Sequence, residues 1–276
     1  MVRKWILAVV VLALLAGTVC AWTLVPWRGW VSAVHMDKAL EAAKKKSCPI
    51  VFLYAEKEAH LVEEKRRMSL ARVWMKLTGL QGMVKVLVYT SRRPPATFEQ
   101  VAGQVQEPDL TTPRMYFATP ELKILGFVLY GAHKKTGNSV ALHARKTMIW
   151  INESRAEMTK AKEAAEEGRF GTALKTYQRI QAEDKKKAVR THITWNVVLT
   201  ENDFDSFYFP EIAGKIEELN EMAEARLQKA KTAYDNKDYK EARKLLAVMV
   251  NNKGDLEAVK EATELLEKVE EKVKEK

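Results

Sequence analysis

Short apolar runs and longer stretches with helical spacing alternate along the first half of the chain. Four runs rich in β-forming residues predict strands, at residues 50–55, 84–89, 115–118 and 124–130. Three stretches with apolar residues at helical spacing predict helices, at residues 37–46, 56–80 and 98–105. The first strand is continuously apolar, which is typical of a strand buried on both faces. The second, apolar except at Lys85, is interpreted as another buried strand. The order of elements predicts an α/β fold in which helices cover a mixed sheet.

The pattern changes at about residue 151, where the predicted strands stop. Beyond this point Ala, Glu, Lys and Leu recur at helical spacing to the end of the chain. This change in composition places a domain boundary near residues 152–155. We therefore expect a sheet-containing domain over residues 22–153 and an all-α domain of helical hairpins over residues 154–276.

The second half contains an internal repeat. Residues 161–173 align with residues 230–242, and each copy has small residues, a short turn, an aromatic residue and a further alanine. The aromatic residues are Phe170 and Tyr239, and each would pack where one helix turns into the next. This pattern resembles the middle of a tetratricopeptide repeat, and it predicts two helical hairpins. Ordinary antiparallel helices remain the alternative, because the two copies lie farther apart than adjacent repeats would.

The N-terminus has the pattern of a secretory signal peptide. Arg3 and Lys4 precede a short apolar run, which small residues follow up to Ala21. We expect cleavage after Ala21, so that residues 1–21 are removed and the protein acts outside the cytoplasm, in the periplasm or envelope or as a secreted protein. Two alternatives stay open: residues 5–25 could remain as a membrane anchor, and Cys20 could carry a lipid.

Charge and cysteine content narrow the possible partners. The net charge is +10, but the lysine runs at residues 44–46 and 185–187 lie in helical stretches and are interpreted as solvated helix faces. No nucleic-acid-binding motif accompanies them, so no nucleic-acid partner is expected. Cys20 and Cys48 are the two cysteines of the sequence, and removal of the first would leave no possible intramolecular disulfide. The histidines lack metal-ligand spacing, and neither a metal nor a cofactor is expected.

Residues 37–131 resemble a thioredoxin-like domain. The resemblance rests on the first helix, Cys48-Pro49, the strand IVFLYA, Thr112-Pro113-Arg114 before the third strand, and Gly131 after the fourth. It implies that Glu58 and Leu61 occupy the positions of the family's two redox cysteines. It also implies that Thr112 and Pro113 occupy the place of the family's cis-proline loop, which makes them a candidate peptide-binding loop.

The missing cysteines argue against redox catalysis. Thiol–disulfide exchange needs an attacking thiolate and a resolving thiol, and Glu58 and Leu61 supply neither. Cys48 precedes its strand and would lie at the end opposite this site. We therefore expect no catalytic residues of the usual kind and a non-catalytic module that binds another protein or acts as a scaffold, with Thr112-Pro113 offering a strand-addition edge.

Two other classes of function remain as alternatives. An atypical enzyme on the same fold could use the Cys48 thiol, or His60 with a neighbouring carboxylate. A membrane-tethered envelope protein could instead assemble with copies of itself through its helical part. An aromatic cluster in an irregular segment is predicted to be core rather than an exposed partner site: Trp195, Phe204, Phe207, Tyr208 and Phe209.

Overall fold

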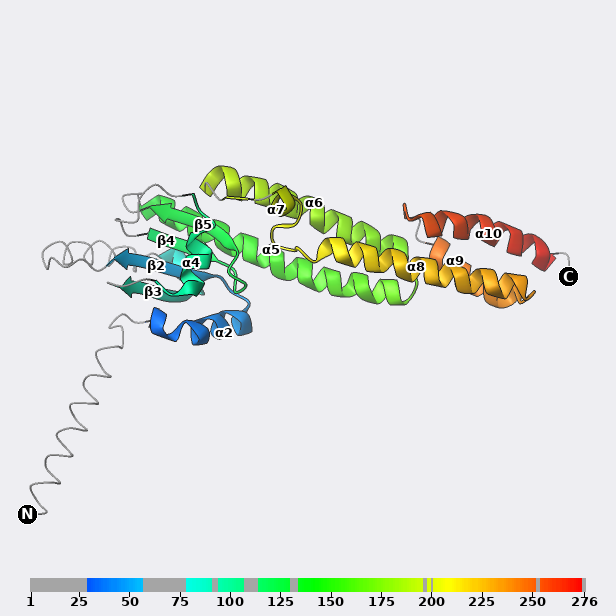
Figure 1. The fold of residues 1–276 in the computed structure, drawn as a ribbon, viewed down its shortest axis with the longest axis horizontal. Coiled ribbons are helices and arrows are strands. Elements are labelled where there is room, and N and C mark those ends of the chain that lie inside the picture. Colours follow the sequence, from blue (N-terminus) through cyan, green and yellow to red (C-terminus); the bar gives the residue numbers. More distant parts are fainter. Residues whose placement is uncertain are drawn as a thin grey trace, which may run out of the picture. The chain divides into compact units, whose positions relative to one another are not determined.

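The computed structural model describes residues 29–56, 78–90, 94–106, 114–129, 134–195, 198–199, 201–251 and 254–274 (Figure 1). These residues form two compact units. Unit 1 comprises Met1–Ile149 and Ile193–Val198, and unit 2 comprises Trp150–His192 and Leu199–Lys276. The predicted signal peptide at residues 1–21, the possible anchor at residues 5–25 and most of the helix predicted at 56–80 lie outside the described residues.

Unit 1 is built on a mixed five-stranded sheet in the order β1-β3-β2-β4-β5. Its strands are β1 Trp30–Ser32, β2 Ile50–Glu56, β3 Val84–Thr90, β4 Arg114–Ala118 and β5 Ile124–Leu129. Both β1 and β2 run parallel to β3, whereas β4 is antiparallel to β2 and β5 is antiparallel to β4. The four predicted strands are confirmed, and the short edge strand β1 was not predicted.

Helices pack against this sheet because each buries one apolar face. Helix α2 (Met36–Lys46) buries Met36, Ala39 and Ala43, and helix α4 (Ala96–Ala102) buries Phe98 and Val101. Unit 1 also contains two short 3-10 helices, η1 (Ala33–His35) and η2 (Thr78–Leu80). The central strand β2 is fully enclosed, since its residues from 50 to 53 have no exposed surface.

Unit 2 is all-helical, as the composition of the second half predicts. Its helices are the second part of α5 (Lys134–Glu166), α6 (Phe170–Trp195), α7 (Glu201–Ser206), α8 (Ile212–Asp235), α9 (Tyr239–Val250) and α10 (Glu257–Lys274). Helix α5 is continuous over 33 residues. The predicted boundary between residues 153 and 154 therefore lies inside a helix, and the change in composition marks no linker at that point.

The repeated sequence forms two hairpins with the same turn. In the first, Gly168 donates to the Ala165 carbonyl at 2.8 Å and Arg169 donates to the Ala164 carbonyl at 2.8 Å. In the second, 69 positions later, Lys237 donates to the Tyr234 carbonyl and Asp238 donates to the Ala233 carbonyl, each at 2.9 Å. Gly168 and Lys237 both have positive φ, at 87° and 63°. Both turns are thus Schellman motifs, which satisfy carbonyls at a helix C-terminus.

The two hairpins share one hydrophobic core. The buried residues of this core come from α5, α6, α8, α9 and α10. They include Ala173 and Ala242, the alanines that follow Phe170 and Tyr239 by three positions in the two copies of the repeat. The loop before α10 packs closely on the start of α6, because a Cβ built on Gly254 would lie 2.6 Å from the Cα of Gly171. Within the described part of the chain, no helix is both long enough and apolar enough to span a bilayer.

Candidate functional site

The site residues expected from sequence lie in segments that the structure does not describe. Glu58, Leu61 and His60 fall within residues 57–77, and Thr112 and Pro113 fall within residues 107–113. Their proposed roles therefore remain predictions. The described residues nearest to them in sequence are those at the end of β2 and at the start of β4, which are neighbouring strands of the sheet.

An aromatic cluster with a buried arginine occupies this end of the sheet. Tyr54 pairs with Arg114 across the strands, so both side chains are on the same face. Phe98 of α4 stacks on Tyr54 with ring centroids 5.1 Å apart, and it meets Tyr116 edge-on at 5.2 Å. Arg114 is only 1% exposed. The residue that follows Pro113 in sequence is thus enclosed in the core of unit 1.

Burial determines the ionisation of this cluster. Desolvation raises the pKa of Tyr116 to about 12, so its hydroxyl stays protonated at neutral pH. Desolvation lowers the pKa of Arg114, an effect that Tyr116 and Tyr54 partly offset, but a guanidinium remains a cation in a protein. The cluster supplies a fixed positive charge and the neutral hydroxyl of Tyr116. This buried arginine was not predicted from the sequence, because the strand was expected to begin at Met115, one residue later.

Cys48 lies at the end of β2 opposite to Glu56. It is buried and free, and its backbone N–H donates to the Ala43 carbonyl at 3.1 Å, where Ser47 closes α2 with a φ of 48°. Burial raises the pKa of the Cys48 thiol, which reduces the thiolate present at neutral pH. This environment is that of a structural cysteine rather than of an activated nucleophile.

Unit 2 contains an open groove of about 490 Å³ between α5, α6 and the start of α8. Its lining carries three cations and one carboxylate: Arg155, Lys162, Lys215 and Glu211. Tyr177 and Met158 also line the groove, and desolvation raises the pKa of the Tyr177 hydroxyl, so it is available there as a neutral donor or acceptor. Two of these cations are paired with carboxylates, since Lys215 lies 2.7 Å from Glu218 and Lys162 lies 3.9 Å from Glu166. The groove therefore has a mixed charge, with apolar and hydroxyl groups in its lining.

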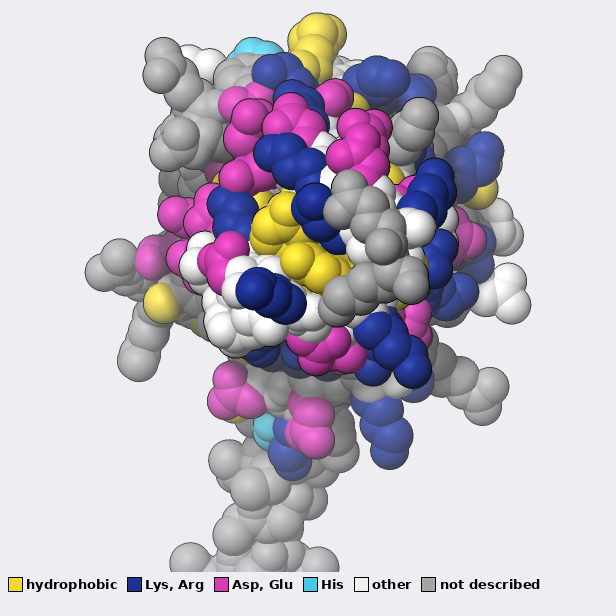
Figure 2. Space-filling view, turned by 90° about the vertical axis from the view of Figure 1, so that its right-hand side faces the viewer, with side chains coloured by type: hydrophobic (Ala, Val, Ile, Leu, Met, Phe, Trp, Pro, Cys, Tyr) yellow, Lys and Arg dark blue, Asp and Glu magenta, His cyan; other side chains and the backbone are white. Residues whose placement is uncertain are grey.

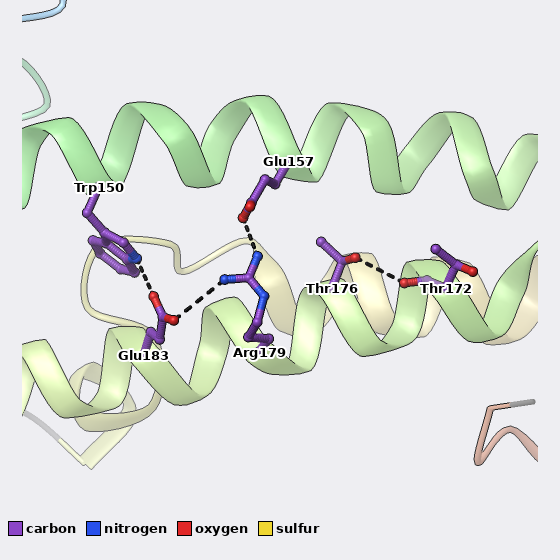
Figure 3. A network of polar contacts seen from close by, with 6 residues as sticks. All are labelled: Trp150, Glu157, Thr172, Thr176, Arg179 and Glu183. Atoms are coloured by element: carbon purple, nitrogen blue, oxygen red, sulfur yellow. Dashed lines mark hydrogen bonds and ion pairs between the residues drawn. The ribbon is translucent and has the colours of Figure 1, made fainter. Parts of the chain in front are cut away.

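Polar contacts hold α5 and α6 in register on another side of the hairpin (Figure 3). The Trp150 indole donates to Glu183 at 2.6 Å, and Arg179 bridges Glu183 to Glu157 through hydrogen bonds and ion pairs. The charged members are 39–48% exposed, so each pair contributes at most about 1 kcal/mol. These contacts align two helices and do not form a chemical centre.

A buried carboxylate fixes the irregular segment that precedes α8. Asp184 has no exposed surface, and it accepts hydrogen bonds from the backbone N–H groups of Tyr208 at 3.0 Å and Phe209 at 2.9 Å. The Tyr208 hydroxyl lies 3.2 Å from the Thr191 hydroxyl. The prediction that the aromatic segment is core is confirmed for Phe207, Tyr208 and Phe209, whereas the side chains of Trp195 and Phe204 lie outside the described residues.

The lysine runs are mostly solvated, as the sequence predicts. Lys185 and Lys186 are exposed, as are the three lysines at 44–46. The prediction is wrong for Lys187, which is half-buried with its ammonium 4.7 Å from the centre of the Trp150 ring. Burial lowers the pKa of Lys187. The reason for the difference is that Trp150 offers an aromatic face to this one position of the run.

At the end of unit 2 that carries the α8–α9 turn, a small group of hydrophobic side chains is ringed by charged ones (Figure 2). Tyr234 and Tyr239 flank this turn with ring centroids 5.5 Å apart, and both pack partly buried against the core of the unit. These two tyrosines therefore form part of the edge of the hydrophobic core of unit 2.

No group of three or more His, Cys, Asp or Glu side chains among the described residues could hold a metal ion. No protein-family model matches this chain, and no curated protein matches it by sequence. The geometry of the two units is therefore the basis for the functional proposal.

Proposed function

We propose that the protein is an extracytoplasmic, non-catalytic binding module that presents its helical unit to another protein. The observation that carries this proposal is the repetition of one hairpin turn, with the same hydrogen bonds at residues 168 and 237, within a single helical core. Stacked helical hairpins are an architecture that creates extended binding surfaces. On this proposal unit 2 is tetratricopeptide-like.

Unit 1 supports the non-catalytic part of the proposal. Its mixed sheet and its order of strands and helices agree with a thioredoxin-like domain, which the residues around Cys48-Pro49 and Thr112-Pro113 suggest. The burial of Cys48 and its raised pKa weigh against the alternative enzyme that would use this thiol. Thr112 and Pro113 remain the proposed peptide-accommodating loop.

The groove between α5 and α8 is the proposed contact surface on unit 2. The lining includes Arg155, Lys162 and Lys215, and a partner with acidic side chains would compete with Glu166 and Glu218 for the two lysines. An acidic partner segment is therefore the proposed ligand of this groove. Its volume falls within the range of known ligand sites. Met158 would contribute an adaptable apolar contact and Tyr177 a hydroxyl.

Site-specific photo-crosslinking tests this surface. A photoreactive residue at position 159 replaces an exposed threonine in the groove whose hydroxyl donates to the carbonyl four residues before it. Position 232 is the matched control, because Thr232 is also exposed on a helix of unit 2 and makes the same local hydrogen bond. With an envelope extract, we expect a discrete crosslinked product at position 159 and none at position 232.

Charge reversal makes the test specific. Lys162→Glu with Lys215→Glu should abolish the product at position 159, because an acidic partner would then be repelled. Identical products at both positions, or a product insensitive to charge reversal, would contradict the proposed groove. The redox alternative is tested separately by insulin reduction, where activity that persists in Cys48→Ala would contradict the non-catalytic assignment.

A further inference from the structure

Met158 lies where the hydrophobic core of unit 2 meets the groove between α5, α6 and the start of α8. It is half-buried, it packs against the core, and it also lines the groove. The groove is open and holds about 490 Å³, many times the ~30 Å³ that one water molecule occupies in the liquid. A solute of the size of hydrogen peroxide therefore reaches this lining while the unit stays folded.

The other methionines that the structure describes lie in different environments. Met222 is 39% exposed on α8 and does not line this groove. Five more belong to the hydrophobic core and are at most 8% exposed: Met36, Met83, Met115, Met148 and Met249. Reaction with a small oxidant follows exposure, so we expect Met222 to oxidise first, Met158 next and the buried methionines last.

We propose that Met158 is an oxidation site through which hydrogen peroxide lowers the affinity of the groove for its partner. This regulation rests on the proposed binding function of the same groove. A lone pair of the Met158 sulfur attacks one oxygen of the peroxide, so an S–O bond forms and the O–O bond breaks. The leaving hydroxide takes the proton of the transferred hydroxyl and becomes water. The thioether is thus oxidised by two electrons to the sulfoxide, and the peroxide is reduced.

A sulfoxide changes the chemistry of the groove because it replaces an apolar side chain with a polar one. Arg155, Lys215 and the Tyr177 hydroxyl line the same groove and are hydrogen-bond donors. On the proposed function these donors bind the carboxylates of the partner, and a sulfoxide oxygen in the same groove competes for them. The adaptable apolar contact of the thioether is lost at the same time. Reductases return the sulfoxide to the thioether, so the change is reversible.

The experiment oxidises the purified full chain, with the photoreactive residue at position 159, before it meets any partner. Catalase removes the hydrogen peroxide, the protein is mixed with untreated envelope extract, and the yield of crosslinked product is measured. Met158→Leu is treated in the same way, as is Met222→Leu, the matched control for an accessible methionine outside the groove. Peptide mass spectrometry measures the sulfoxide at positions 158, 222 and 148, and circular dichroism reports whether the helices stay folded.

We expect sulfoxide at positions 158 and 222 but not at 148, and a yield about tenfold below that of the untreated protein, as for the loss of one charge-assisted hydrogen bond. Peroxide should lower the yield equally in Met222→Leu and leave it unchanged in Met158→Leu. No sulfoxide at 158, a yield insensitive to its formation, an equal loss in Met158→Leu, or a loss that accompanies unfolding overturns the regulation alone. Absence of product from the untreated protein contradicts the binding function of the groove, and the regulation with it.

Discussion

Replacing Gly168 with alanine should destabilise unit 2, although alanine normally strengthens helical proteins. Gly168 has a φ of 87°, and a Cβ there would lie 2.6 Å from the guanidinium carbon of Arg226. A left-handed conformation costs an L-residue about 1–2 kcal/mol, and alanine recovers about 0.4–1 kcal/mol through the unfolded chain. The Arg226 side chain must also move. The expected net loss in the free energy of unfolding is about 1–2 kcal/mol.

Two matched variants isolate the cause. Gly214→Ala changes a glycine of α8 that has ordinary φ and nothing within 4 Å of its Cβ position, so it should stabilise by about 0.5–1 kcal/mol. Lys237→Gly removes a lysine from the same position of the second turn, where φ is 63°, and should stabilise by a similar amount. Lys240→Ala, an exposed position on α9, controls for the lost charge.

The measurement is urea denaturation followed by far-ultraviolet circular dichroism, which reports on the helices of unit 2. Each kcal/mol should move a thermal midpoint by roughly 2–4 °C as a second measure. A shift of stability in the same direction for Gly168→Ala and Gly214→Ala would refute the left-handed requirement at residue 168. If Lys237→Gly destabilises more than Lys240→Ala, the two turns do not share one left-handed conformation.

Three further predictions concern buried groups. Asp184→Asn should destabilise by about 1–3 kcal/mol in urea denaturation, because the carboxylate accepts two buried backbone N–H bonds, whereas exposed Asp205→Asn should cost less than about 1 kcal/mol. Burial raises the pKa of Tyr116 to about 12, so stability present below pH 10 should fall by roughly 2–3 kcal/mol as pH rises through 12, and Tyr116→Phe should flatten this fall. In a Cys20→Ser background, Cys48 should react with iodoacetamide about tenfold or more slowly than a free thiol until urea unfolds the protein.

The sequence predicts the strands of unit 1 well where apolar runs are long. Residues 50–55 are continuously apolar and residues 84–89 are apolar except at Lys85, and both runs form central strands of the sheet. Strand β1 escaped prediction because it has three residues, too few to show either alternation or a continuous run. It forms because its backbone pairs with Lys85, Val86 and Leu87 of β3, and this contact between distant segments has no local signal in the sequence.

The buried charges were harder to predict than the strands. By sequence, Arg114 follows a proline and precedes the predicted strand, but its pairing with Tyr54 encloses it in the sheet. Asp184 stands next to a run of lysines and suggests a solvated face. Helical spacing nevertheless pointed to burial of Asp184. It lies on the same face of α6 as four other buried residues: Tyr177, Ile180, Ala188 and Thr191. Charged residues on an apolar stripe merit a search for partners before they are assigned to solvent.

The continuity of α5 changes how the two units should be tested. A boundary at residues 153 and 154 suggests a truncation there, but α5 runs without interruption from Lys134 to Glu166. Cutting after Asn152 would leave a new helix end beside Ile151 and remove the Trp150–Glu183 bond, so a truncated chain could lose binding merely because its helix frays. Substitutions at exposed positions such as Thr159 and Lys162 leave the helix intact. A loss of partner binding in those variants is then attributable to the altered surface, which no deletion within α5 would allow.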